Sequence, residues 1–189
     1  MSGYIEWDYG EKALRLYRQM QNEAPDCSDA LTCTIALQAC ISLSGKEEIL
    51  LERCPAKSIG LEIGRALHAG AYREGFVSDL LVSCTLVSMY SRCGTMIEAQ
   101  NMFNELLSKP TTNVSWCVML STYIEHRELK MALLLYRKMQ EEGYDPDQVT
   151  MTLALQACSF LAEREMSSKL LDQPISVEIG KALHADARR

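Results

Sequence analysis

The strongest constraint on the fold of this chain is that it repeats itself. Three blocks occur twice, in the same order and at nearly the same spacing: 13–21 and 132–140, 32–40 and 150–158, and 62–69 and 178–185. The second pair reads TCTIALQAC and TMTLALQAC, a match too close to arise by chance. Sequences with internal copies of this kind build repeat architectures, in which similar units stack on one another.

One stretch, residues 113–147, shows what a unit folds into. Apolar residues recur at steps of three and four within 114–124 and again within 129–139, as in two amphipathic helices. The polar turn 126–128 separates them. Gly143 follows the second helix, at a place where a left-handed residue commonly ends a helix. The unit is therefore predicted to be a hairpin of two helices.

The preceding stretch, 80–112, fits the same template in a shorter form. Its first helix is expected to run to about Arg92, with the turn at Gly94. Thr95 and Glu98 have the spacing of a capping box, which predicts that a second helix begins at this point.

A longer version of the hairpin occupies residues 30–79. Its helices are expected at 31–43 and 59–73, separated by an insert at about 44–58. The extra residues lie between the helices and interrupt neither of them.

The two ends of the chain match parts of units. Residues 148–189 begin a second long unit with an insert at about 163–176, and residues 1–29 match the end of a shorter one. The chain is thus expected to begin and end within a unit. No stretch shows the alternation of a β-strand, so the predicted fold class is all-α, a right-handed α-solenoid of stacked helix-turn-helix units.

Charge and composition argue against several functions. The net charge of −6 opposes a broad basic face for nucleic acid. No apolar run approaches the ~20 residues of a membrane helix, and the first residues lack the features of a secretory or transit peptide. The eight cysteines include no CxxC pair, so we expect reduced thiols rather than disulfides or metal ligands.

No catalytic arrangement is recognisable in the sequence. His126 and Glu128 have the H-x-E spacing of zinc deaminases, but no Pro-Cys-x-x-Cys motif exists to complete a metal site. His68 and His184 occupy equivalent places in a duplicated block, which indicates helix packing. We therefore expect no enzyme, no cofactor and no small-molecule substrate.

The motifs resemble those of one known family. Residues 113–147 carry Val-Ser-Trp near their start, ALxLYxxMQ in the second helix and GYDPD at their end, as in a pentatricopeptide repeat. LVSMYSRCG at 86–94 with EAQNMF at 98–103 resembles the short variant of that repeat. LQAC at 37–40 with the block at 62–69 resembles the long variant.

The order of the units is also typical of this family. It resembles the alternation of P, L and S repeats in the PLS subclass of land-plant organelle proteins. The units read as partial P (1–29), L (30–79), S (80–112), P (113–147) and partial L (148–189).

The resemblance implies that the chain binds single-stranded RNA with one base per repeat. In this family the fifth and last residues of a unit contact the base edge, and an apolar second residue sandwiches the bases. The fifth residues are Thr34, Cys84, Cys117 and Thr152. The last residues are Asp29, Asp79, Thr112 and Asp147. The second residues are Leu31, Leu81, Val114 and Val149.

Several of these positions depart from the family pattern. Thr34 with Asp79 is the clean pair, which in the family's code favours guanine. Cys84 and Cys117 replace hydroxyl or amide residues with weak hydrogen-bonding groups, and Thr112 stands where Asp or Asn is usual. The sequence thus predicts weak binding with little sequence preference.

Phosphate contacts are expected to be few. Arg92 occupies the place late in the first helix where the family often has a basic residue, but Glu125 stands at the corresponding place in the P unit. With the net charge of −6, this again predicts weak RNA binding by this chain alone.

The function that follows is RNA binding by part of an organellar editing or processing specificity factor. Its partners would be single-stranded RNA and editing or processing proteins, and its location mitochondrion or chloroplast, by the resemblance. Two alternatives stay open. One is a tetratricopeptide-like scaffold for protein partners, since the Ala-x-x-x-Tyr and Ala-x-x-x-Phe spacings fit that hairpin too. The other is a truncated copy without a specific function.

Overall fold

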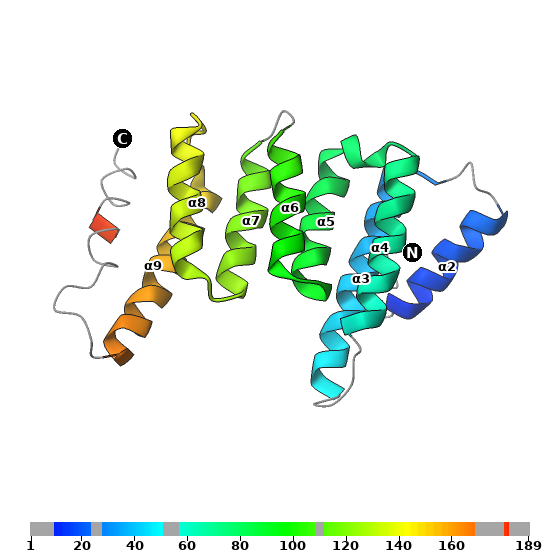
Figure 1. The fold of residues 1–189 in the computed structure, drawn as a ribbon, viewed down its shortest axis with the longest axis horizontal. Helices are drawn as coiled ribbons and strands as arrows, with labels where there is room; N and C mark the ends of the chain where they lie inside the picture. The colour runs from blue at the N-terminus through cyan, green and yellow to red at the C-terminus, as the bar shows by residue number, and fades with distance from the viewer. Residues whose placement is uncertain (1–9, 24–27, 51–56, 109–111, 169–179, 182–189) are drawn as a thin grey trace. The chain divides into compact units, whose positions relative to one another are not determined.

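The structure is a computed structural model that describes residues 10–23, 28–50, 57–108, 112–168 and 180–181. Within these ranges every regular element is helical, which confirms the all-α fold class (Figure 1). The elements are α2 (Gly10–Glu23), α3 (Ala30–Leu50), α4 (Lys57–Arg73), the 3-10 turn η2 (Phe76–Ser78), α5 (Leu80–Cys93), α6 (Met96–Leu107), α7 (Asn113–Glu125), α8 (Leu129–Glu141) and α9 (Gln148–Ser168).

The chain divides into two compact units, Met1–Pro110 and Thr111–Arg189. In the first unit α3 packs against α2, α4 and α5, and α5 packs against α4 and α6. In the second unit α7, α8 and α9 pack pairwise against one another. Within each unit, every helix contacts its sequence neighbour, and α3 with α5 and α7 with α9 also touch, as stacked helical hairpins do.

The predicted turn between α5 and α6 is present. The backbone N–H of Gly94 donates to the carbonyl oxygen of Tyr90 at 2.9 Å, which closes the end of α5. The Thr95 hydroxyl oxygen accepts from the Glu98 N–H at 3.3 Å, and Glu98 Oε2 accepts from the Thr95 N–H at 3.0 Å. This reciprocal pair confirms the capping box.

The turns around α8 contain two left-handed residues. Gly143 has a φ of 85°, which confirms the expected helix end. Arg127 has a φ of 60°, which the sequence did not indicate, because this conformation costs a side-chain-bearing residue ~1–2 kcal/mol. Its N–H donates to Ile124 O at 3.0 Å, and its guanidinium lies 4.7 Å from the centroid of the Phe160 ring on α9. Both contacts offset the cost.

Two helices extend further than predicted. The first helix of the long unit was expected to end at about Leu43, but α3 runs to Leu50, into the expected insert 44–58. Likewise α9 continues to Ser168, into the expected insert 163–176, of which 169–176 lie outside the described residues. Both extensions are rich in Glu, Lys, Leu or Met, which are good helix formers, and neither contains a proline.

The core consists of apolar side chains from both helices of each hairpin. Tyr17, Phe103, Tyr136 and Met139, which recur at helical spacing, are buried in it, and Met20 is partly exposed. Trp116 on α7 is fully buried, and its ring lies tilted by 54° against that of Tyr144, with 5.6 Å between the ring centroids. No described helix is long and apolar enough to cross a membrane.

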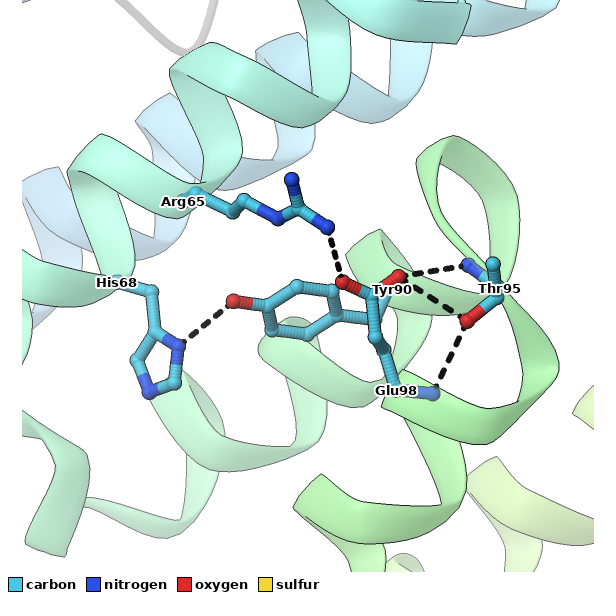
Figure 2. Close-up of polar contacts among 5 residues, drawn as sticks. All are labelled: Arg65, His68, Tyr90, Thr95 and Glu98. Atoms are coloured by element: carbon cyan, nitrogen blue, oxygen red, sulfur yellow. Dashed lines mark hydrogen bonds and ion pairs between the residues drawn. The ribbon is translucent and has the colours of Figure 1, made fainter.

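A polar cluster joins α4 to α5 and α6 (Figure 2). The Nδ1 atom of His68 and the hydroxyl oxygen of Tyr90 share a hydrogen bond of 2.8 Å. Nearby, Arg65 Nη2 donates to Glu98 Oε1 at 2.5 Å. Because α4 falls in the predicted long repeat and α5 and α6 in the short one, these contacts hold two successive hairpins together.

Candidate nucleic-acid interface

Four large apolar side chains are exposed at equivalent places. Each is the second residue of a first helix, on α3, α5, α7 or α9. Their exposed fractions are nearly equal: Leu31 57%, Leu81 54%, Val114 56% and Val149 55%. The residue three positions further along each helix is buried on α3 and α5, half-buried on α7 and exposed on α9, so the exposed first-turn side chain is the feature that the four helices share. Aliphatic side chains so placed can pack against the faces of planar ligands.

The residues before three of these helices cap them. Asp79 Oδ1 accepts from the backbone N–H groups of Leu81 at 2.8 Å and Val82 at 3.2 Å. Asp29 Oδ1 accepts from the Thr32 N–H at 2.7 Å, and this contact together with the Thr32 hydroxyl lowers the pKa of Asp29. The aspartates at unit ends therefore act as N-caps of the following unit, whatever else they contact.

Asp147 caps α9 in the same way. Its Oδ1 accepts from the Thr150 N–H and from the Thr150 hydroxyl, each at 2.8 Å. The backbone bond to Thr150 is the main reason that the pKa of Asp147 is lowered. Thr112 differs, because it occupies the N-cap of α7 without any side-chain hydrogen bond to that helix.

The predicted base-reading residues on the helices differ in accessibility. Thr34 is only 2% exposed, and its hydroxyl donates to the carbonyl oxygen of Ala30 at 2.8 Å. Cys84 is 5% exposed. Cys117 is half-buried and Thr152 is exposed, with its hydroxyl donating to Gln148 O at 2.7 Å. A base edge can reach the last two more readily than the first two.

The second unit brings a predicted pair together. Burial, with a smaller contribution from the negative charge of Asp147, raises the pKa of the Cys117 thiol to about 11. This coupling places the fifth residue of the unit 113–147 near its last residue. No corresponding interaction links Thr34 to Asp79 among the contacts of the described residues, so that pair stays a prediction.

Sequence reasoning missed Asn113 as a member of this site. Asn113 Nδ2 donates to the carbonyl oxygen of Asp145 at 2.9 Å. Its side chain also hydrogen-bonds to the Asp147 carboxylate, which helps to lower the pKa of that group. The available signal was spacing, because Asn113 precedes Cys117 by one helical turn and so shares its face of α7.

The remaining predicted residue is Arg92. It lies exposed in the last turn of α5, a position from which a long cation can contact phosphate. Glu125 is also exposed at the end of α7. Among the residues that the structure describes, no group of three or more His, Cys, Asp or Glu side chains could hold a metal ion. The described cysteines are free thiols.

Comparison with known proteins matches this chain to one family. Residues 111–159 match the family described as the PPR repeat family, and residues 1–23 and 83–110 match the PPR repeat.

Individual relatives come from Arabidopsis thaliana. The chloroplastic pentatricopeptide repeat-containing protein DOT4 is 31% identical over 159 residues, which cover 84% of this chain and 16% of the relative. A second chloroplastic pentatricopeptide repeat-containing protein is 31% identical over 183 residues, which cover 96% of this chain and 31% of the relative. A third, named as mitochondrial, is 31% identical over 159 residues, covering 84% and 23%. The chain thus spans less than a third of the length of these relatives.

Proposed function

Because the chain belongs to the pentatricopeptide repeat family, we propose that it binds single-stranded RNA along the first turns of α3, α5, α7 and α9. The observation that carries this proposal is the equal exposure of Leu31, Leu81, Val114 and Val149. A folded chain without a ligand would gain by covering these side chains, and nucleic-acid bases offer flat apolar faces of suitable size.

Stacking supplies most of the binding free energy in this proposal. Each aliphatic side chain covered by a base contributes roughly 1–2 kcal/mol through burial of apolar surface, and this contact with the base face is tolerant of sequence. Bases must be unpaired to enter, because stacking and edge contacts both require that they leave a duplex. The ligand is therefore single-stranded RNA rather than a double helix.

Electrostatic attraction contributes little. The net charge of −6 repels a polyanion at long range, and Arg92 is the one cation that we assign to phosphate. Few released counterions give a shallow dependence of affinity on salt concentration. Affinity is accordingly modest for a chain of this length.

The biological setting follows from the relatives. Their names place them in chloroplasts or mitochondria, and we propose the same organelles for this protein. The order of long, short and standard units supports the PLS subclass. The chain then acts as the RNA-recognising part of an editing or processing factor, with catalysis supplied by another domain or protein.

The test uses two leucines of similar exposure. Leu81 on α5 is 54% exposed, and Leu134 on α8 is 58% exposed. Leu81→Ala should weaken binding of a labelled single-stranded RNA by about 1 kcal/mol or more, because one platform is lost. Leu134→Ala removes the same atoms from a second helix and should leave the affinity unchanged. Both should alter the free energy of unfolding by less than about 0.5 kcal/mol.

Fluorescence anisotropy of the full chain with single-stranded and double-stranded RNA measures these affinities. Equal binding of both RNA forms, or equal losses in the two variants, would contradict the proposed surface. Binding of neither RNA form would contradict RNA binding itself.

A further inference from the structure

The reading of a base by the unit 113–147 depends on which of its side chains can hydrogen-bond to a base edge. We propose that the amide of Asn113, and not the thiol of Cys117, is the group that does so, and that it favours guanine. This inference rests on the proposed RNA binding and adds a specificity-determining residue to it.

Three side chains meet beside the start of α9. Asn113 and Cys117 lie one turn apart on α7, and both interact with Asp147. Asn113 does so by a hydrogen bond, and Cys117 is close enough for the negative charge of Asp147 to raise the pKa of its thiol. Val114 directly follows Asn113, and Val149 lies two residues after Asp147; both side chains are more than half exposed. A base held between these two valines therefore has its edge near all three polar groups.

The orientation of the Asn113 amide is determined by its partners. The carbonyl oxygen of Asp145 and the carboxylate of Asp147 both only accept hydrogen bonds, so the amide nitrogen must face them. The amide oxygen consequently points to neither. It accepts no hydrogen bond from any residue in the described part of the chain. An oriented acceptor is thus available without rearrangement.

Cys117 is a poor alternative. With its pKa raised to about 11, the thiol stays protonated at neutral pH. A thiol is a weak donor and a weak acceptor, and Cys117 is only partly exposed. Its contribution to discrimination between bases should be small.

The available groups favour a base that donates. The Asn113 oxygen accepts, and the Asp147 carboxylate adds negative charge, so acceptors on a base edge are disfavoured here. Guanine presents two adjacent donors on its Watson–Crick edge, an imino and an amino group. Adenine and cytosine present one amino group beside a ring acceptor, and uracil presents one imino group between two carbonyls. Guanine is therefore the base that fits.

The first residues of the other helices provide internal comparisons. α3 begins with Ala30 and α5 with Leu80, neither of which can hydrogen-bond through its side chain. Among these four helices, only α7 with Asn113 and α9 with Gln148 begin with a side chain that can hydrogen-bond to a base edge. Removing the Asn113 amide should change the preference at one position of a bound RNA and leave the preferences at the others.

The experiment selects from a pool of short single-stranded RNAs of random sequence with the full chain, followed by sequencing of the bound fraction. The wild type should enrich guanine at the position read by the unit 113–147, which is identified as the guanine position that a substitution of Asn113 alters, whereas any guanine position read by Thr34 and Asp79 should be insensitive to it. Asn113→Ala should reduce that enrichment by roughly fivefold, the value of one neutral hydrogen bond of about 1 kcal/mol. Cys117→Ala should leave it unchanged, and Asn113→Gln, which keeps an amide, should retain part of it.

The outcomes separate the two proposals. An unchanged preference in Asn113→Ala, even with weaker overall binding, would overturn the inference and show that Asn113 only positions the loop. Loss of the preference in Cys117→Ala would overturn it as well. If the wild type enriches no RNA, the proposed function fails, and the inference falls with it. Should Asn113→Ala fail to fold, loss of the guanine preference in folded Asn113→Gln would overturn the inference.

Discussion

The Nδ1 atom of His68 on α4 lies 2.8 Å from the hydroxyl oxygen of Tyr90 on α5, and the two rings meet edge to face. The contact joins two successive hairpins (Figure 2). Burial lowers the pKa of His68, and the charge of Glu105 opposes this only in part. The folded protein therefore favours the neutral imidazole.

This arrangement predicts that stability falls as the pH drops through about 6.5, the ordinary pKa of histidine. Below that pH the unfolded chain takes up a proton that folded His68 resists, so protonation favours unfolding. Urea unfolding at pH 7.5 and pH 5.5 should show a smaller loss in His68→Gln than in the wild type. An equal loss in both proteins would show that His68 contributes nothing to the pH dependence.

A second prediction concerns Glu98, which has two roles. It accepts from Arg65 and also completes the capping box with Thr95. Arg65→Ala removes only an exposed ion pair and should cost ~0–1 kcal/mol of unfolding free energy. Glu98→Ala removes the cap as well and should cost about 1–2 kcal/mol. Chemical denaturation measures both, and an equal cost would indicate that the capping box is energetically unimportant.

Two of the three glycines of α4, Gly64 and Gly70, provide a third prediction. A Cβ at Gly64 would lie 2.4 Å from Met89 Sδ, and Met89 is fully buried, so the sulfur has little room to move. A Cβ at Gly70 would meet nothing within 4 Å. Gly64→Ala should therefore destabilise the protein by ~1–2 kcal/mol, despite the better helix propensity of alanine. Gly70→Ala should stabilise it by up to about 1 kcal/mol.

Urea unfolding of the two variants side by side checks this prediction. Stabilisation by both substitutions would mean that α4 and α5 can separate slightly at no cost. Destabilisation by both would mean that Gly70 is packed more closely than its surroundings indicate.

Features that depend on neighbouring residues in the sequence could be predicted well. The capping box at Thr95, the left-handed Gly143 and the polar turn 126–128 each follow from a local rule, and the structure contains all three. The ends of α3 and α9 were less predictable. No proline or helix-ending glycine marks them, so the repeat pattern alone suggested where the helices would stop.

The candidate site could be predicted only in part, because accessibility depends on packing. Leu31 and Thr34 lie on the same first turn of α3, yet the leucine is 57% exposed and the threonine 2%. Neither value follows from the sequence, since it is set by the helices that pack against α3. The contact of Asn113 with Asp145 depends likewise on the path of the chain after α8, which no local motif determines.

The last prediction uses the one unit end that lacks a side-chain cap. Thr112 has the extended backbone of an N-cap, with φ −128° and ψ 169°, but its side chain makes no hydrogen bond to α7. At the same place before α5, Asp79 accepts from two backbone N–H groups. Thr112→Asp should therefore raise the free energy of unfolding by about 0.5–1 kcal/mol, through the cap and the favourable charge at the helix start.

Thr112→Asn separates these two causes, because asparagine supplies the capping oxygen without the charge. It should give most of the gain, and the remaining difference between the variants should shrink at high salt. Urea unfolding at low and high salt measures both effects. If neither variant is more stable than the wild type, the backbone N–H groups at the start of α7 are already well solvated, and the absent cap has no energetic consequence.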